Sequence, residues 1–101
     1  MAQFDVYINT NKDTNDEIPY LLDIQNDILK SLNTRVVVPL VKNQKTITHL
    51  TPSFTIEDTE VVMLTMQLAG IPSSVLGDKI CNLKEKRTEI LNAIDFMISG
   101  F

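Results

Sequence analysis

Hydrophobic and polar residues alternate near the start of the chain, which is the pattern of a strand that buries one face. Phe4, Val6 and Ile8 alternate with polar positions and predict a strand over residues 3–8. The same period recurs from Tyr20 to Gln25 and predicts a second strand. Both strands are therefore expected to lie half-buried in one sheet.

The stretch between these strands, Asn9–Glu17, is almost wholly polar and contains no aliphatic residue. It has nothing to bury, so we expect a mobile loop, which is either a plain connection or a contact for a partner. After the second strand, residues 28–32 are expected to form an irregular turn that leaves Ile28 and Leu29 exposed.

A β-branched run, Arg35–Val41, predicts a third strand. Pro39 lacks the N–H that a central ladder needs, so this strand is expected at an edge or at a bulge. Residues 46–50 are expected to form a brief further strand.

A hairpin is predicted next, with Phe54 and Ile56 on its near arm and a turn through residues 57–60. The far arm is expected to place Val62, Leu64, Met66 and Leu68 on one face. Glycines, prolines and serines mark residues 70–78 as a connection. Since the strands follow one another without helices, the sheet should be antiparallel.

The last part of the chain changes period. Apolar positions three or four apart predict one helical stripe, made of Leu83, Arg87, Ile90, Leu91, Ile94, Met97, Ile98 and Phe101. Asn82 is the expected N-cap, and Gly100 is expected to end the helix. The fold class is therefore mainly β with a C-terminal α-helix.

Composition fixes the scale of the molecule and restricts its partners. The 101 residues are 44% hydrophobic, which suits a single domain over residues 1–101. The net charge of -4 opposes a bulk electrostatic grip on nucleic acid, so partners are expected to be proteins. The single Cys81, and the lack of a signal peptide or membrane-length apolar run, predict a cytoplasmic protein.

Residue types needed for catalysis are scarce. His49 is the only histidine, Cys81 has no metal-type spacing, and three glycines cannot make a phosphate loop. We expect no enzyme activity, no metal and no cofactor. The basic cluster of Lys84, Lys86 and Arg87 is either a solvated helix face or a surface that steers an acidic partner.

Apolar residues also stand at the end of the chain. Ile98, Gly100 and Phe101 place apolar groups around a flexible residue. Such groups are unfavourable unless something covers them. They either fold back on the core or a second copy, or bind a partner.

Several motifs occur in an order that resembles one family. They are Gln3-Phe4-x-Val6-Tyr7, Asp23-Ile24-Gln25-Asn26-Asp27-Ile28, Arg35-x-Val37-x-Pro39-Leu40, Met63-x-Thr65, Ala69-x-Ile71-Pro72-x-Ser74-x-Leu76-Gly77 and Ile90-x-Asn92-Ala93-Ile94-x-x-Met97-x-x-Gly100. Together they resemble the CcdB toxins of bacterial type II toxin–antitoxin modules over nearly the whole chain.

The resemblance implies an antiparallel SH3-like barrel of the CcdB/MazF type and a homodimer with the helix near its two-fold axis. It also implies that the protein binds the A subunit of DNA gyrase and traps the covalent gyrase–DNA cleavage complex, which is poisoning and not catalysis. A CcdA-like antitoxin would neutralise it.

The resemblance also assigns residues to gyrase binding. They are the tail Ser99, Gly100 and Phe101, the helix residues Asp95 and Ile98, and a patch of Asn26, Ile28 and Leu29. Ser99 stands where the family has tryptophan, and Phe101 where it has isoleucine. An interfacial tryptophan can be worth ~2 kcal/mol, so we hypothesise that Phe101 compensates for its loss.

Contacts with the antitoxin are expected in two loops. The residues are Asn9, Asn11, Asp13, Asn15 and Asp16 in the first loop, and Asn43 and Gln44 in the second.

Two alternatives stay open. One is an endoribonuclease toxin of the related MazF or Kid type, for which Arg35, His49 and nearby threonines are the only candidate chemical groups. The other is a protein with a toxin fold that no longer acts on gyrase and serves as an antitoxin-binding decoy.

Overall fold

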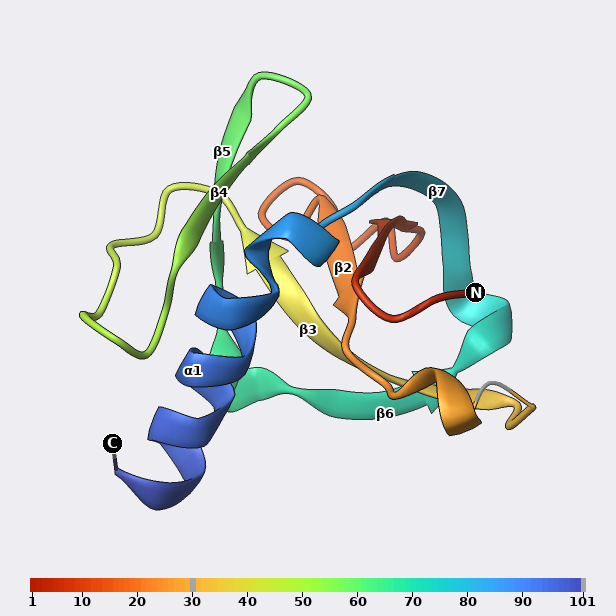
Figure 1. Cartoon of the computed structure of the whole chain (residues 1–101). Coiled ribbons are helices and arrows are strands. Elements are labelled where there is room, and N and C mark those ends of the chain that lie inside the picture. Colours follow the sequence, from red (N-terminus) through yellow and green to blue (C-terminus); the bar gives the residue numbers. More distant parts are fainter. Residues whose placement is uncertain (30, 101) are drawn as a thin grey trace.

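The described residues form one antiparallel sheet and one α-helix, joined by short 3-10 turns (Figure 1). The computed structural model describes residues 1–29 and 31–100, which leaves Lys30 and Phe101 outside it. The strand order is β4-β5-β3-β2-β1-β7, with β6 also paired to β3. The sheet forms a half-barrel, and α1 packs against it, which confirms the predicted fold class.

The elements are short. The strands are β1 Asp5–Asn9, β2 Tyr20–Asp23, β3 Thr34–Val41, β4 Ser53–Ile56, β5 Thr59–Met63, β6 Ala69–Pro72 and β7 Leu76–Asn82. The 3-10 turns are η1 Asp27–Leu29, η2 Thr65–Gln67, η3 Ser73–Val75 and η4 Lys84–Lys86, and α1 spans Arg87–Ser99.

The core lies between the sheet and α1. Val6, Leu22 and Val38 come from three neighbouring strands and are fully buried. They meet Ile90 and Ala93 of α1, which are 0% and 1% exposed. This contact fixes the helix on the sheet and so sets the direction of its C-terminal end.

The first strand differs from its prediction. Phe4 has a left-handed backbone with φ 72°, so β1 begins at Asp5 and not at residue 3. The strand is also not half-buried: Asp5 and Tyr7 are buried, while Ile8 is 37% exposed. The polar side chains can be buried because Tyr7 and Asn82 donate hydrogen bonds to the Asp5 carboxylate.

The third strand is central, so the predicted edge position of Pro39 was wrong. β3 pairs with β2 on one side and with both β6 and β5 on the other. On that second side β6 pairs as far as Val37 and β5 begins at Leu40. Pro39 lies in the gap, where its carbonyl accepts the Leu64 N–H, and a proline nitrogen on the same side of the strand interrupts no ladder.

Residues 70–78 contain most of β6, the turn η3 and the start of β7, and the sequence predicted neither strand. β6 pairs with β3, and β7 pairs with β1. Neither segment has the alternation of a half-buried strand; both depend on distant partners. Gly77 permits the close approach, because a Cβ there would lie 2.8 Å from the Ile8 carbonyl oxygen.

The predicted hairpin is confirmed, but its turn and far arm are shorter. Glu57 and Asp58 have φ of 48° and 64°, which is the two-residue turn that matches strand twist. The far arm ends at Met63, because η2 begins at Thr65, whose hydroxyl donates to the Leu50 carbonyl.

The brief strand predicted over residues 46–50 is absent from the described chain. Residues 48–50 form a turn, in which His49 has φ 67°. The N–H groups of Leu50 and Thr51 both donate to the Ile47 carbonyl. That local pairing leaves these groups unavailable to a neighbouring strand.

The helix begins later than predicted. Asn82 is the last residue of β7 and is not the N-cap of α1, which is Lys86; its Oδ1 accepts the Lys84 N–H at 2.8 Å at the start of η4. The C-terminal end is as predicted: Gly100 has φ 80°, and its N–H donates to the Phe96 carbonyl.

Candidate functional site

The C-terminal end of α1 exposes an apolar side chain. Ile98 is 74% exposed, whereas Ile90, about two turns earlier on the same helix, is fully buried. Gly100 follows in a left-handed conformation, which turns the chain out of the helix. The geometry therefore leaves Ile98 available to a partner.

The other predicted residues of this helix end are also exposed. Ser99 and Asp95 lie in the last turn, where the Ser99 hydroxyl donates to the Asp95 carbonyl at 2.7 Å. This bond holds the Ser99 side chain along the helix. Phe101, the proposed substitute for tryptophan, lies outside the described residues.

The second predicted patch lies on η1, whose backbone is held by hydrogen bonds from Gln25 and Asn26. Asn26 Oδ1 accepts the Ile28 N–H at 2.9 Å. Gln25, which is buried, donates from Nε2 to the Leu29 carbonyl and accepts the Val36 N–H at Oε1, so it fastens η1 to β3. These hydrogen bonds hold the backbone of η1 in place, while the Ile28 side chain is 84% exposed.

Leu29 and Leu32 extend this patch at 46% and 51% exposure. The sequence analysis missed Leu32 and the positioning role of Gln25. The one signal for them in the sequence is the amide residue Gln25 within the predicted second strand, followed by aliphatic residues in the turn over residues 28–32. Ile28, Leu29 and Leu32 are called the η1 patch below.

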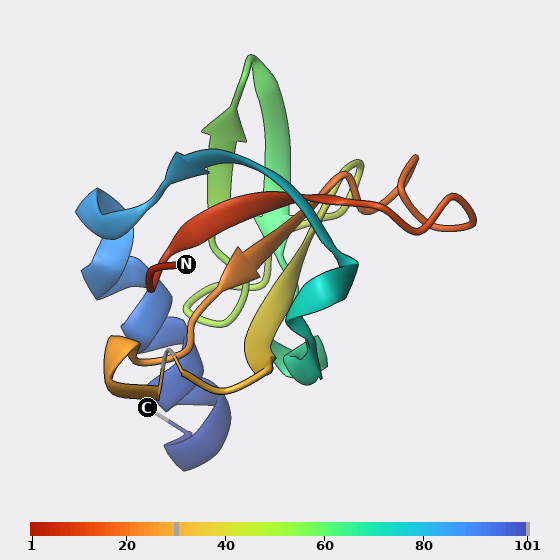
Figure 2. The same ribbon diagram turned by 90° about the vertical axis from the view of Figure 1, so that its right-hand side faces the viewer.

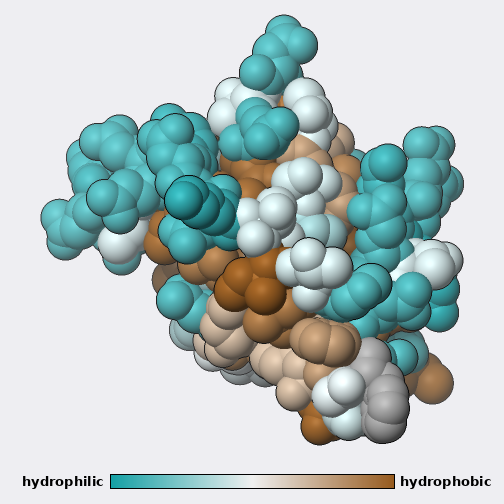
Figure 3. Space-filling view, turned by 90° about the vertical axis from the view of Figure 1, so that its left-hand side faces the viewer, coloured by the Kyte–Doolittle hydropathy of each residue, from teal (hydrophilic) through white to brown (hydrophobic). Residues whose placement is uncertain are grey.

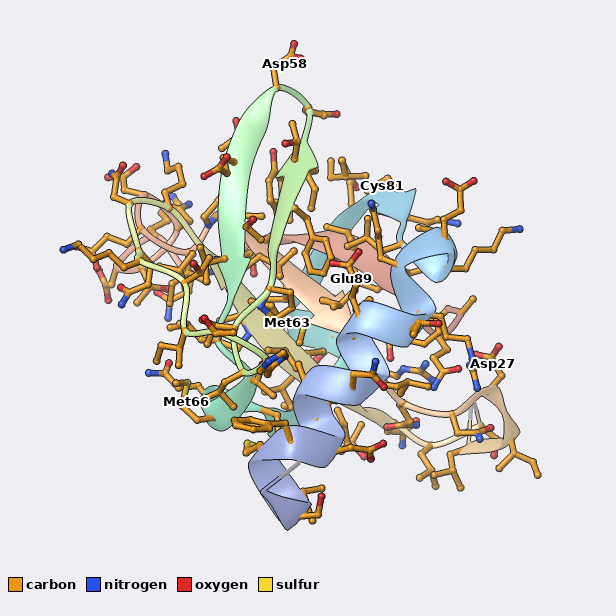
Figure 4. The ribbon with its side chains drawn as sticks, turned by 60° about the vertical axis from the view of Figure 1, so that its left-hand side comes forward. Asp27, Asp58, Met63, Met66, Cys81 and Glu89 are labelled. Atoms are coloured by element: carbon orange, nitrogen blue, oxygen red, sulfur yellow. The ribbon has the colours of Figure 1, made fainter. Side chains whose placement is uncertain are left out.

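The structure does not bring the η1 patch and the helix end together. Figure 1 places η1 at the right of the molecule and the C-terminal end of α1 at the left, with β6 between them. In Figure 4, Asp27 of η1 and Met66 of η2 likewise lie on opposite sides of α1. One chain therefore presents two separate apolar contacts.

The two loops predicted to meet an antitoxin do lie together. The Lys42 N–H donates to the Glu17 carbonyl at 2.9 Å, which joins the second loop to the first. Figure 2 shows residues 9–17 projecting on the side opposite α1.

Side chains in these loops differ in availability. Asn11, Asp13 and Asp16 in the first loop and Asn43 and Gln44 in the second are exposed, and Asn15 is half-buried. Asn9 is 7% exposed, and its amide donates to the Thr14 hydroxyl and the Ile18 carbonyl. Asn9 thus shapes the first loop from inside.

A hollow of about 600 Å³ lies between residues 46–52 and α1. Ile47, 50% exposed, and Pro52 line it from the loop, and Asn92 and Phe96 from the helix. The His49 ring packs against Phe96 with 5.9 Å between ring centroids. Figure 3 shows apolar surface across the centre and lower part of this side of the molecule.

Arg35 and His49 do not form a catalytic pair at the surface. Arg35 is 1% exposed, and its Nη2 lies 2.7 Å from Asp23 Oδ2 inside the sheet. His49 lies in the turn against α1, where its ring packs on Phe96 and not on Arg35. Residues 1–29 and 31–100 contain no group of three or more His, Cys, Asp or Glu suited to a metal ion.

The thiol of Cys81 does not add a reactive group to this surface. Burial raises the pKa of the half-buried Cys81 thiol, with nearby Glu57 adding to the effect, so the thiol is not activated.

None of the helices in the described part of the chain has the length and apolar character to cross a bilayer.

Comparison with known proteins places the chain beside toxins of toxin–antitoxin modules. The family model described as CcdB protein matches residues 3–100. An endoribonuclease solved in complex with its cognate antitoxin, from a mycobacterial species, has a similar structure with a TM-score of 0.77. The two chains are 15% identical, and the match covers 97% of this chain and 94% of the other. At that identity the likeness shows the fold alone.

Proposed function

Because the chain belongs to the CcdB family, we propose that this toxin of a toxin–antitoxin module binds the A subunit of DNA gyrase and traps the gyrase–DNA cleavage complex. One observation carries the proposal: Ile98 is 74% exposed at a helix end that turns outward at Gly100. A branched apolar side chain in that position is unfavourable in water and suits a protein contact.

The η1 patch supports a second contact. Ile28 is 84% exposed although Gln25 and Asn26 hold the backbone beneath it. A rigid apolar patch loses little conformational entropy on binding, which favours affinity. Because this patch and the helix end lie apart, gyrase would have to contact two faces of one chain or one face on each of two copies.

The proposed action needs no catalysis. A ligand shifts an equilibrium by its different affinity for the two states. A toxin that binds the cleaved gyrase–DNA state more tightly than the resealed state therefore accumulates broken DNA. Consistent with this, Arg35 is buried against Asp23 and cannot reach a substrate without breaking that ion pair.

The experiment is a cleavage assay with purified toxin, gyrase, ATP and supercoiled plasmid, stopped with detergent and protease. We expect linear plasmid in proportion to toxin, because the trapped complex holds a double-strand break. Omission of ATP or gyrase is the control. Full activity of Phe101→Ala would contradict the hypothesis that Phe101 replaces the family's tryptophan.

An endoribonuclease activity is the second candidate, since the similar mycobacterial structure is described as an endoribonuclease. The shared fold is its support; the burial of Arg35 and the net charge of -4 count against it. The same preparation is incubated with RNA in parallel, where cleavage would favour this candidate. If neither linear plasmid nor cleaved RNA forms, the antitoxin-binding decoy is the alternative that remains.

We also propose that a CcdA-like antitoxin contacts the joined loops that contain Asn11, Asp13 and Asn43. Their side chains are exposed, and the hydrogen bond from the Lys42 N–H to the Glu17 carbonyl joins the two loops, so that they can act as a single surface. Replacing Asp13 and Asn43 with alanine should weaken antitoxin binding in calorimetry and leave plasmid cleavage unchanged.

A homodimer is proposed from the apolar surface beside α1. Ile47 and Met66 are 50% and 45% exposed there, and the 600 Å³ hollow adjoins Ile47. A second copy would cover this surface. Sedimentation should give twice the monomer mass, and Ile47→Glu should shift it toward the monomer.

A further inference from the structure

A second hollow, of about 470 Å³, lies where the N-terminal segment meets β7 and the start of the helix. Lys79, Lys84 and Arg87 line it together with the carboxylates of Asp5 and Asp27. It is called the cationic hollow below. It shares no lining residue with the helix end, and it adjoins the η1 patch only through Asp27.

Positive charge is concentrated at this place. Residues 79–87 contain four of the nine Lys and Arg residues and one acidic residue, Glu85, although the whole chain has a net charge of -4, and three of the four cations line the hollow. Local charge of a sign opposite to the rest of the surface selects partners and steers their approach. The hollow is therefore a distinct electrostatic feature and not part of a generally basic surface.

The carboxylate in the floor does not cancel this charge. Asp5 accepts hydrogen bonds from the Ala2 N–H, the Tyr7 hydroxyl and Asn82 Nδ2 at 2.9–3.0 Å, and its Oδ1 lies 3.2 Å from Lys79 Nζ. With its side chain 3% exposed, Asp5 is fully bonded inside the fold. Lys79 remains 55% exposed, so its ammonium can also face the hollow.

The other two cations that line the hollow, Lys84 and Arg87, have no carboxylate partner in the described chain. Lys86 lies 4.0 Å from Glu89, whereas Lys84 and Arg87 have no carboxylate within that distance among residues 1–29 and 31–100. Arg87 is positioned over the ring of the buried Phe4, 5.8 Å from its centroid. Asn82 Oδ1 accepts the Lys84 N–H and fixes the backbone there.

We propose that the cationic hollow binds an acidic peptide segment of a partner protein, with Lys84 and Arg87 contacting its carboxylates. A guanidinium held over an aromatic ring suits a carboxylate, because its planar fork donates two parallel hydrogen bonds. The exposed Ile28 beside Asp27 offers an apolar contact next to the charges. A nucleic-acid backbone fits less well, since Asp27 at the rim and the net negative chain repel a continuous row of phosphates.

The test uses a fluorescein-labelled ten-residue peptide in which Glu alternates with Ser, and measures binding by anisotropy. Removing two interfacial charges with Lys84→Gln and Arg87→Gln together should weaken binding about tenfold. The matched control, Lys12→Gln with Lys45→Gln, removes the same charge from exposed loop positions and should change binding less than about twofold.

Three binding results would each overturn the proposal. They are equal weakening by the two double variants, equal binding of a peptide with Gln in place of Glu, and tighter binding of a ten-nucleotide thymidine strand. Circular dichroism checks that the variants fold. Titration of the wild-type protein, followed by NMR, should move the Asn82 side-chain amide signal, and no movement would also contradict the proposal. Gyrase cleavage is not part of this readout, so the inference stands or falls separately from the proposed function.

Discussion

Arg35 and Asp23 form an ion pair inside the sheet, with Nε and Nη2 of Arg35 each 2.7 Å from the same carboxylate oxygen. The side chains are 1% and 0% exposed. Burial raises the pKa of Asp23, while the Gln25 N–H and Arg35 oppose that rise. The Nη1 of Arg35 has no hydrogen-bond partner in the described chain, so the arginine depends on Asp23 for its compensation.

Removing one member of this pair should destabilise the protein strongly. Asp23→Ala leaves a buried guanidinium without its carboxylate, which typically costs about 3–5 kcal/mol. The measurement is urea-induced unfolding followed by circular dichroism. The double variant Asp23→Leu/Arg35→Met should regain most of that stability, because it leaves no uncompensated charge. A double variant as unstable as the single one would contradict this view.

Asp5 should make stability depend on pH. Burial by itself raises the pKa of Asp5, but the hydrogen bonds from Asn82, the Ala2 N–H, Tyr7 and Lys79 outweigh it, and the net pKa lies below its ordinary value. A folded-state pKa below the unfolded one means that the ionised carboxylate stabilises the fold. That contribution is present above the unfolded pKa of about 4 and is lost as the pH falls through the lower folded pKa.

Asp5→Asn tests this dependence. We expect it to cost roughly 1–3 kcal/mol at pH 7, since hydrogen bonds to a charged acceptor are lost. The difference from wild type should shrink below about pH 4. Urea unfolding at pH 7, 5 and 3 measures it, with Asp13→Asn in the exposed loop as the control. A difference that does not change with pH would be evidence against the role of the ionised form.

The C-terminal glycine should matter for stability in a way that another glycine does not. Gly100→Ala places a Cβ on a backbone at φ 80°, which costs roughly 1–2 kcal/mol although no atom lies within 4 Å. Gly70→Ala has the same open space without a left-handed backbone and should change stability little. Thermal unfolding of the two variants compares them. Equal melting temperatures would show that Gly100 is not under conformational constraint.

Local patterns predicted the elements whose structure is decided locally. The stripe through Ile90 and Ile94 predicted α1, and Gly100 predicted its end, because both signals lie within a few residues. The turn at Glu57 and Asp58 was predicted for the same reason, although its two-residue form was not. The exposure of Ile28 followed from its place after a strand end.

Pairing over long distances decided the rest. β7 forms because β1 lies beside it, and Asn82 reaches Asp5 across 77 positions of sequence to satisfy a buried carboxylate. No local pattern contains that relation, so β6, β7 and the burial of Asp5 were missed. The cationic hollow was predictable only in part, because the sequence contains the basic cluster but does not show that Arg87 lies over Phe4.

The exposed isoleucine at the helix end should be necessary for gyrase poisoning. Ile98→Asp replaces a 74% exposed apolar contact with a charge, so the fold should be unaffected and plasmid linearisation should fall at least about thirtyfold if the residue is central to the interface. Val75→Asp, at a 44% exposed apolar residue of η3, is the matched control. Comparable losses in both variants would indicate a general effect of added charge.

Restoring the family's tryptophan should strengthen poisoning. Ser99 is exposed in the last turn, and its hydroxyl donates to the Asp95 carbonyl at the surface, so a larger side chain at this position would be open to a partner. An interfacial tryptophan can contribute ~2 kcal/mol, which corresponds to about thirtyfold in affinity. Ser99→Trp should therefore linearise plasmid at a correspondingly lower toxin concentration.

Ser99→Ala separates the hydrogen bond from the aromatic ring. It removes the bond to the Asp95 carbonyl without adding surface, and it should leave plasmid linearisation close to wild type because that bond is exposed and joins two residues of the same helix. If Ser99→Trp gave no gain while Ile98→Asp still abolished activity, the tail would bind gyrase in a geometry different from the family's. The helix end would then still be the contact, but position 99 would no longer face its partner.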